Sequence, residues 1–134
     1  MIKVIYYSKS GNTKALADAI ASAAKTKAIS VDEKDSKINQ EIDILFIGGA
    51  LYMYGLDSKI VNYIKELDTN KIKKAVVFST SWISKHSISL IKEELLNKNI
   101  DVVEDYIYYK NMPSDEELKE AQEKTKRIIK ELKK

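Results

Sequence analysis

Nearly continuous apolar runs alternate along this chain with stretches in which apolar residues recur at helical spacing. Runs of this kind are typical of parallel β-strands that are covered on both faces. Residues 28–31 differ, because their alternating pattern indicates a strand with one solvent-exposed side, which we place at a sheet edge. The predicted strands are residues 2–7, 28–31, 43–47, 75–78 and 101–109. The predicted helices span residues 12–24, 56–67 and 88–96. A fourth begins at Ser114, which caps it together with Glu117 three residues later in a capping box.

This alternation of strands and helices predicts an α/β fold of the doubly wound type. We expect a five-stranded parallel sheet with helices on both faces, and one domain over residues 1–134, since no linker or repeat interrupts the chain. In the strand order 2-1-3-4-5 of such folds, ligands bind beyond the carboxyl ends of strands 1 and 3. The loops that lie at this edge begin at Ser8, Ala50 and Ser79.

The first of these loops has the composition of a phosphate-binding site. It consists of Ser8, Lys9, Ser10, Gly11, Asn12 and Thr13. Its three hydroxyls lie beside the free N–H groups of a helix's first turn, where the helix dipole favours an anion, and its glycine allows a positive φ. The alternative is that Ser10 or Asn12 only caps the helix, as both residue types commonly do. One hydroxyl suffices for a cap, so we favour anion binding.

Aromatic residues occupy the other two loops. Residues 50–55 contain Tyr52 and Tyr54, and residues 79–85 contain Trp82. A flat ring could stack between these side chains. The alternative is that the aromatic residues only cover the strand ends. The neighbouring phosphate loop favours stacking.

Together the three loops resemble those of the flavodoxin family. The first is similar to the motif Ser/Thr-x-Ser/Thr-Gly-Asn-Thr, which follows the first strand of flavodoxins and holds the phosphate of flavin mononucleotide (FMN). The second flavin loop of flavodoxins is similar to the stretch Gly48-Gly49-Ala50-Leu51-Tyr52-Met53-Tyr54-Gly55 of this chain. The third flavin loop of flavodoxins is similar to Phe78-Ser79-Thr80-Ser81-Trp82. The resemblance covers essentially the whole chain and implies a flavodoxin-like fold with FMN as the cofactor.

The resemblance also implies which residues contact the flavin. Tyr54 or Tyr52 would cover one face of the ring system, and Trp82 the other face or the edge. The backbone at Gly55 would reorient to accept a hydrogen bond from reduced flavin N5. The residues implied to bind the cofactor are Ser8, Lys9, Ser10, Gly11, Asn12, Thr13, Ala50, Leu51, Tyr52, Met53, Tyr54, Gly55, Ser79, Thr80, Ser81 and Trp82.

Three functions agree with this resemblance. Residues 101–109 carry no long insertion, so the chain resembles the short-chain class. The chain shows no recognisable nicotinamide site and has little length to spare for a substrate pocket, so the first expectation is an electron carrier between redox partner proteins. The third loop of many flavodoxins reads Gly-Asp-Ser followed by Tyr, whereas this chain has Ser79-Thr80-Ser81-Trp82. Ser79-Thr80-Ser81 together with Tyr52-Met53-Tyr54-Gly55 is more similar to flavodoxin-like domains that include a bacterial protoporphyrinogen dehydrogenase. An FMN-dependent reductase or dehydrogenase is therefore the second expectation. The third is a flavin-free signalling or scaffold module.

Composition and charge exclude several kinds of cofactor and partner. The chain contains no cysteine, which excludes disulfides and cysteine-ligated metal centres, so redox work needs a bound organic cofactor. The P-loop and dinucleotide-binding motifs are absent. A net charge of +3 without a basic block argues against nucleic-acid binding. No apolar run approaches the length of a membrane span, and we expect a cytoplasmic monomer.

Five charged or titratable residues lie close in sequence to the predicted loops, and each has an expected role. His86 is the sole histidine and has no second ligand for a metal, so we interpret it as a surface or loop-packing residue. Asp57 is interpreted as a carboxylate at a helix N-terminus rather than as a general base. Lys9, Lys59 and Lys85 lie close to the loops in sequence, which predicts a flavin reduction potential less negative than in strongly acidic flavodoxins.

Overall fold

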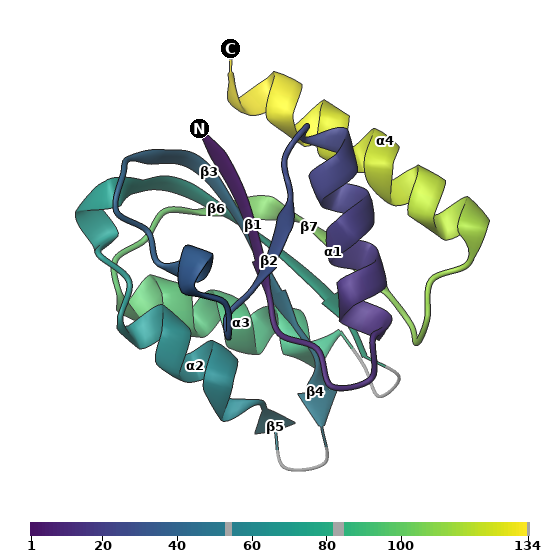
Figure 1. Cartoon of the computed structure of the whole chain (residues 1–134), viewed down its shortest axis with the longest axis horizontal. Helices are drawn as coiled ribbons and strands as arrows, with labels where there is room; N and C mark the ends of the chain where they lie inside the picture. The colour runs from purple at the N-terminus through teal and green to yellow at the C-terminus, as the bar shows by residue number, and fades with distance from the viewer. Residues whose placement is uncertain (53–54, 82–84, 134) are drawn as a thin grey trace.

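The computed structural model describes residues 1–52, 55–81 and 85–133, and these residues form a five-stranded parallel sheet with flanking helices (Figure 1). The strands of this sheet are β1 (Ile2–Tyr6), β2 (Ala28–Ser30), β3 (Ile42–Gly49), β6 (Ile72–Thr80) and β7 (Val102–Tyr109). Their order across the sheet is β2-β1-β3-β6-β7. When only these five strands are counted, this is the predicted order 2-1-3-4-5. The doubly wound α/β fold is confirmed.

Helices cover both faces of the sheet. The α-helices in the described residues are α1 (Asn12–Ala23), α2 (Ser58–Lys65), α3 (His86–Asn97) and α4 (Asp115–Leu132), and two short 3-10 helices are η1 (Lys34–Ser36) and η2 (Thr69–Lys71). Helices α1 and α4 lie on one face, and α2 and α3 on the other (Figure 1). The predicted capping box at α4 is present, since Ser114 and Glu117 exchange hydrogen bonds of 3.0 and 3.1 Å. No helix in these residues is long and apolar enough to cross a membrane.

Each face of the sheet has its own apolar core. Successive residues of a strand point to opposite faces, so Val4 and Phe46 pack beneath α1 and α4, whereas Ile5 and Ile47 pack beneath α2 and α3. All four side chains are fully buried. Burial on both faces explains why the central strands are nearly continuous in apolar residues.

The central strands extend further than predicted, and one predicted loop contains a short hairpin. Pairing between β3 and β6 continues to Gly49 and Ser79, because the backbone ladder does not depend on apolar side chains. After β3, the strands β4 (Leu51–Tyr52) and β5 (Gly55–Leu56) pair in antiparallel fashion. Helix α2 consequently begins at Ser58, two residues later than its apolar pattern indicated.

Candidate functional site

The three predicted loops leave the sheet at one edge. In the observed register Tyr6 of β1 lies beside Gly48 of β3, and Gly49 lies beside Ser79 of β6. The carboxyl ends of these neighbouring strands therefore meet. Strand β1 lies between β2 and β3, so the connections from β1 and β3 run in opposite directions. A crevice at such a switch point is where doubly wound sheets bind ligands.

Two serine hydroxyls shape the loop after β1. Ser8 Oγ accepts a hydrogen bond from the Gly11 N–H at 2.9 Å, and Ser10 Oγ accepts one from the Asn12 N–H at 3.4 Å. Gly11 has a φ of 92°, a left-handed conformation that glycine adopts at little cost, and it is the N-cap residue of α1. The predicted positive φ is confirmed. The alternative that Ser10 or Asn12 is the N-cap residue is wrong.

Several backbone N–H groups at the N-terminus of α1 are available to bind an anion. Within the described residues, the N–H groups of Ser10, Thr13 and Lys14 have no hydrogen-bond acceptor. A Cβ placed on Gly11 would meet no atom within 4 Å, so the loop borders open space. Amide donors at a helix N-terminus, together with two serine hydroxyls, are a donor set that suits phosphate. The residues present therefore fit the phosphate end of a nucleotide.

The third hydroxyl of this loop lies inside the protein. Thr13 is 1% exposed, and its Oγ1 atom lies 2.7 Å from Oγ1 of Thr80, which is 3% exposed at the end of β6. This hydrogen bond joins the start of α1 to the third loop. The two residues are 67 positions apart, and no motif or spacing in the sequence relates them. Sequence reasoning selected both residues but missed the bond between them.

The serines of the third loop are also buried. Ser79 forms hydrogen bonds with the Gly49 carbonyl at 2.6 Å and with the Ser87 hydroxyl of α3 at 2.7 Å. The carbonyl of Ser81 accepts a hydrogen bond from the Tyr108 hydroxyl. Burial raises the pKa of Tyr108, so its hydroxyl remains protonated and can donate. These bonds hold the ends of β3 and β6 and the start of α3 in a fixed arrangement.

The second loop contributes a glycine turn. Ala50 is half-buried, Leu51 is buried in β4, and Tyr52 ends that strand. Gly55 has a φ of 106°, and a Cβ placed on it would meet no atom within 4 Å, so its backbone is accessible to a ligand. The predicted site residues that lie outside the described residues are Met53, Tyr54 and Trp82. Aromatic stacking on a flavin therefore stays a prediction.

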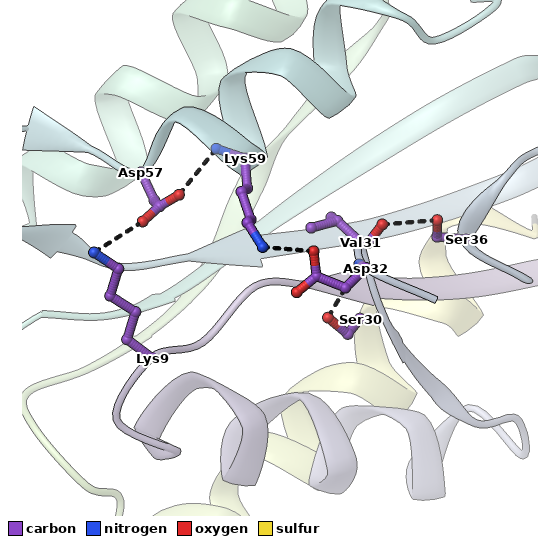
Figure 2. Close-up of polar contacts among 7 residues, drawn as sticks. All are labelled: Lys9, Ser30, Val31, Asp32, Ser36, Asp57 and Lys59. Carbon is purple, nitrogen blue, oxygen red and sulfur yellow. Dashed lines mark hydrogen bonds and ion pairs between the residues drawn. The ribbon is translucent and has the colours of Figure 1, made fainter. Parts of the chain in front are cut away.

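A series of charged contacts runs beside these loops (Figure 2). Lys9 Nζ lies 3.4 Å from Oδ2 of Asp57, the N-cap residue of α2, and Oδ1 of Asp57 accepts a hydrogen bond from the Lys59 N–H at 2.9 Å. The interpretation of Asp57 as a helix N-terminal carboxylate is confirmed. Lys59 Nζ lies 2.8 Å from Asp32 Oδ1, and this hydrogen bond raises the pKa of Lys59. Both lysines face a carboxylate, which reduces the net positive charge beside the loops.

Two further charged residues lie at the start of α3. His86 is the first residue of this helix, and its side chain is exposed, which confirms the interpretation as a surface residue. Lys85 precedes it, with Nζ 5.8 Å from the centre of the Tyr106 ring on β7. At this distance the lysine makes a cation–π contact with an edge strand of the sheet.

The sheet and its loops define a doubly wound α/β protein whose candidate ligand site lies at the switch point of the sheet. A family model described as a flavodoxin domain matches residues 3–112, which is most of the chain. The chain belongs to the flavodoxin family. Membership of this family implies a flavin cofactor, usually FMN.

Solved structures share this fold over nearly the whole chain. A flavodoxin from the domain Archaea is 23% identical, with a TM-score of 0.83 over 99% of both chains. Oxidised flavodoxin 2 from Bacillus cereus is 17% identical, with a TM-score of 0.79 over 97% of this chain and 98% of that chain. Rubredoxin oxygen:oxidoreductase from Desulfovibrio gigas is 17% identical, with a TM-score of 0.81 over 98% of this chain but 36% of that chain. A comparison with curated protein sequences finds no match.

Proposed function

We propose that this protein binds FMN beyond the carboxyl ends of β1, β3 and β6 and carries electrons between redox partner proteins. The loop at Gly11 supports this proposal most directly. There, amide and hydroxyl donors lie beside open space at the switch point of a flavodoxin-family sheet. The proposed carrier acts as a cytoplasmic monomer.

Different residues would bind the phosphate and the flavin ring of FMN. The N–H groups of Thr13 and Lys14 and the Ser10 hydroxyl would hold the phosphate, whose charge the dipole of α1 stabilises. The turn at Gly55 would bring its backbone against the flavin ring. When bound, FMN would supply the electron-accepting and electron-donating chemistry, which the protein orients and tunes.

Buried hydrogen bonds would keep these binding groups in place. The Thr13–Thr80 bond connects the phosphate loop with the third loop, and the Ser79–Ser87 bond connects that loop with α3. We therefore propose Thr80 and Ser79 as residues that position the site from inside the protein. A site held by buried bonds is ordered before its ligand arrives, which lowers the entropy cost of binding.

Reconstitution with FMN tests the proposal. The purified protein is incubated with excess FMN, passed over a desalting column and examined by absorbance, followed by stepwise reduction and reoxidation. We expect the flavin bands to elute with the protein and to bleach and return reversibly. Elution of all FMN in the small-molecule fraction, under conditions in which the protein is folded by circular dichroism, would contradict FMN binding.

An FMN-dependent reductase or dehydrogenase is the second candidate. The observation that favours it is the match to about one third of the length of an oxygen:oxidoreductase, where the same fold is one part of a larger protein. Turnover of the FMN-loaded protein with a nicotinamide nucleotide or a porphyrinogen distinguishes the candidates. Steady-state turnover with either compound would favour the enzyme, and reduction only through partner proteins would favour the carrier.

A further inference from the structure

Lys9 belongs to the phosphate loop, yet its ammonium group is held by a carboxylate of the neighbouring loop. Figure 2 shows the Lys9 side chain extending from the loop after β1 toward the N-terminus of α2. Its Nζ atom lies 3.4 Å from Oδ2 of Asp57. The lysine side chain is 49% exposed, whereas that of the aspartate is 10% exposed. The carboxylate is thus the fixed partner, and the lysine is the one that reaches across.

Both oxygens of the Asp57 carboxylate have a partner: one partner lies in helix α2, and the other lies in the phosphate loop. Oδ1 accepts the hydrogen bond from the Lys59 N–H in the first turn of α2, and Oδ2 faces Lys9. Asp57 lies two residues after Gly55, whose positive φ defines the turn of the second loop. A nearly buried carboxylate is stable only while its charge is compensated. Movement of either loop relative to the other would remove part of that compensation.

We propose that Lys9 is a positioning residue, which holds the phosphate loop and the Gly55 turn in one arrangement through its ion pair with Asp57. This inference rests on the proposed FMN site. Lys9 then acts on the site through Asp57, and its ammonium is not the direct counter-ion of the phosphate. The two roles differ in their consequence. A positioning residue affects every flavin that contacts the second loop, whereas a phosphate counter-ion affects only phosphorylated flavins.

A double-mutant cycle separates these roles. The variants are Lys9→Gln, Asp57→Asn and the double variant, and the dissociation constants for FMN and for riboflavin are measured by flavin fluorescence. Asparagine is also a favourable N-cap residue, so Asp57→Asn removes the charge while the helix cap is kept. We expect each single variant to bind riboflavin roughly two- to fivefold more weakly, and the double variant to be no weaker than the weaker single variant.

The opposite pattern would overturn the proposal. If Lys9→Gln weakens FMN binding and leaves riboflavin binding unchanged, the lysine neutralises the phosphate directly. Effects of Lys9→Gln and Asp57→Asn that simply add would also exclude coupling through the ion pair. Asp32→Asn is the matched control, because it removes a neighbouring ion pair whose side chains are 50% and 52% exposed. We expect it to change neither dissociation constant by more than about twofold.

A measurement without flavin makes the test independent of the proposed function. Amide hydrogen exchange is followed in the ligand-free protein for the segment 55–59. We expect Lys9→Gln to raise exchange in this segment several-fold, because local opening tracks the contacts that hold a segment and this lysine pairs with a nearly buried carboxylate. Asp32→Asn should leave exchange unchanged, because an ion pair between two exposed side chains contributes little to stability. Unchanged exchange in Lys9→Gln would overturn the positioning role. Failure of the wild-type protein to bind any flavin would instead overturn the proposed function.

Discussion

Replacing Ser10 by alanine should weaken FMN binding far more than riboflavin binding. The Ser10 side chain is exposed, and its hydroxyl forms only a long hydrogen bond of 3.4 Å within the protein, so the fold should tolerate the loss. A hydrogen bond from a hydroxyl to a phosphate is charge-assisted and worth about 1.5–3 kcal/mol. Because this position is exposed, we take the lower value of about 1.5 kcal/mol, which corresponds to roughly a tenfold increase in the dissociation constant. Riboflavin lacks the phosphate and should lose less than about twofold.

Removal of the Thr13 hydroxyl should act mainly on the stability of the fold. Thr13→Val removes a buried hydroxyl and leaves that of Thr80 without its partner, at a cost of about 1–3 kcal/mol. For a domain of this size, each kcal/mol corresponds to roughly 4 °C in melting temperature. Thr13→Ser keeps the hydroxyl and should restore much of the loss. Ser10→Ala, in contrast, should melt within about 1 °C of the wild-type protein.

Flavin fluorescence titrations with FMN and riboflavin, together with thermal melts of the ligand-free proteins, check these expectations. Equal weakening of both ligands in Ser10→Ala would show that the loop does not hold the phosphate. An unchanged melting temperature in Thr13→Val would show that the bond to Thr80 contributes little to the fold. The two results are independent, because one concerns affinity and the other stability.

Three further predictions concern packing, titration and proximity to the flavin. Gly48→Ala should destabilise the fold by roughly 2–3 kcal/mol, because the added Cβ would lie 2.3 Å from the ring of Phe78 and 2.6 Å from the backbone carbonyl oxygen of Phe78. An unchanged midpoint of urea unfolding would contradict this prediction. Burial raises the pKa of Tyr63, whose hydroxyl donates to the Ser36 carbonyl, so stability should be full below about pH 10 and fall above it, where the unfolded chain ionises. Tyr63→Phe should flatten this alkaline loss in pH-dependent melts and cost about 1 kcal/mol at neutral pH. FMN should quench the emission of Trp82, the sole tryptophan; unchanged emission at saturation would place the indole away from the flavin.

The sequence by itself determined the five strands of the main sheet, the four α-helices of the described residues and the class of the fold, because the signals for these elements are local. Continuous apolar runs marked the buried central strands, and alternation marked the edge strand β2. The capping box at Ser114 and the positive φ of Gly11 likewise depend on neighbours within a few residues. Strand order followed from the general arrangement of doubly wound sheets. Side-chain type and spacing are sufficient for inferences of this kind.

Only the tertiary structure decided what each polar side chain of the site contacts. It placed the Thr13 hydroxyl against Thr80 and the Lys9 ammonium against Asp57, although the sequence presented both Thr13 and Lys9 as residues that face a phosphate. It also turned Ser79 inward. These contacts depend on the register between parallel strands, which sets the relative positions of loops that are far apart in sequence. A hydrophobic pattern specifies which face of a strand is buried, but it carries no information about which distant polar group a buried hydroxyl or a long lysine side chain will reach.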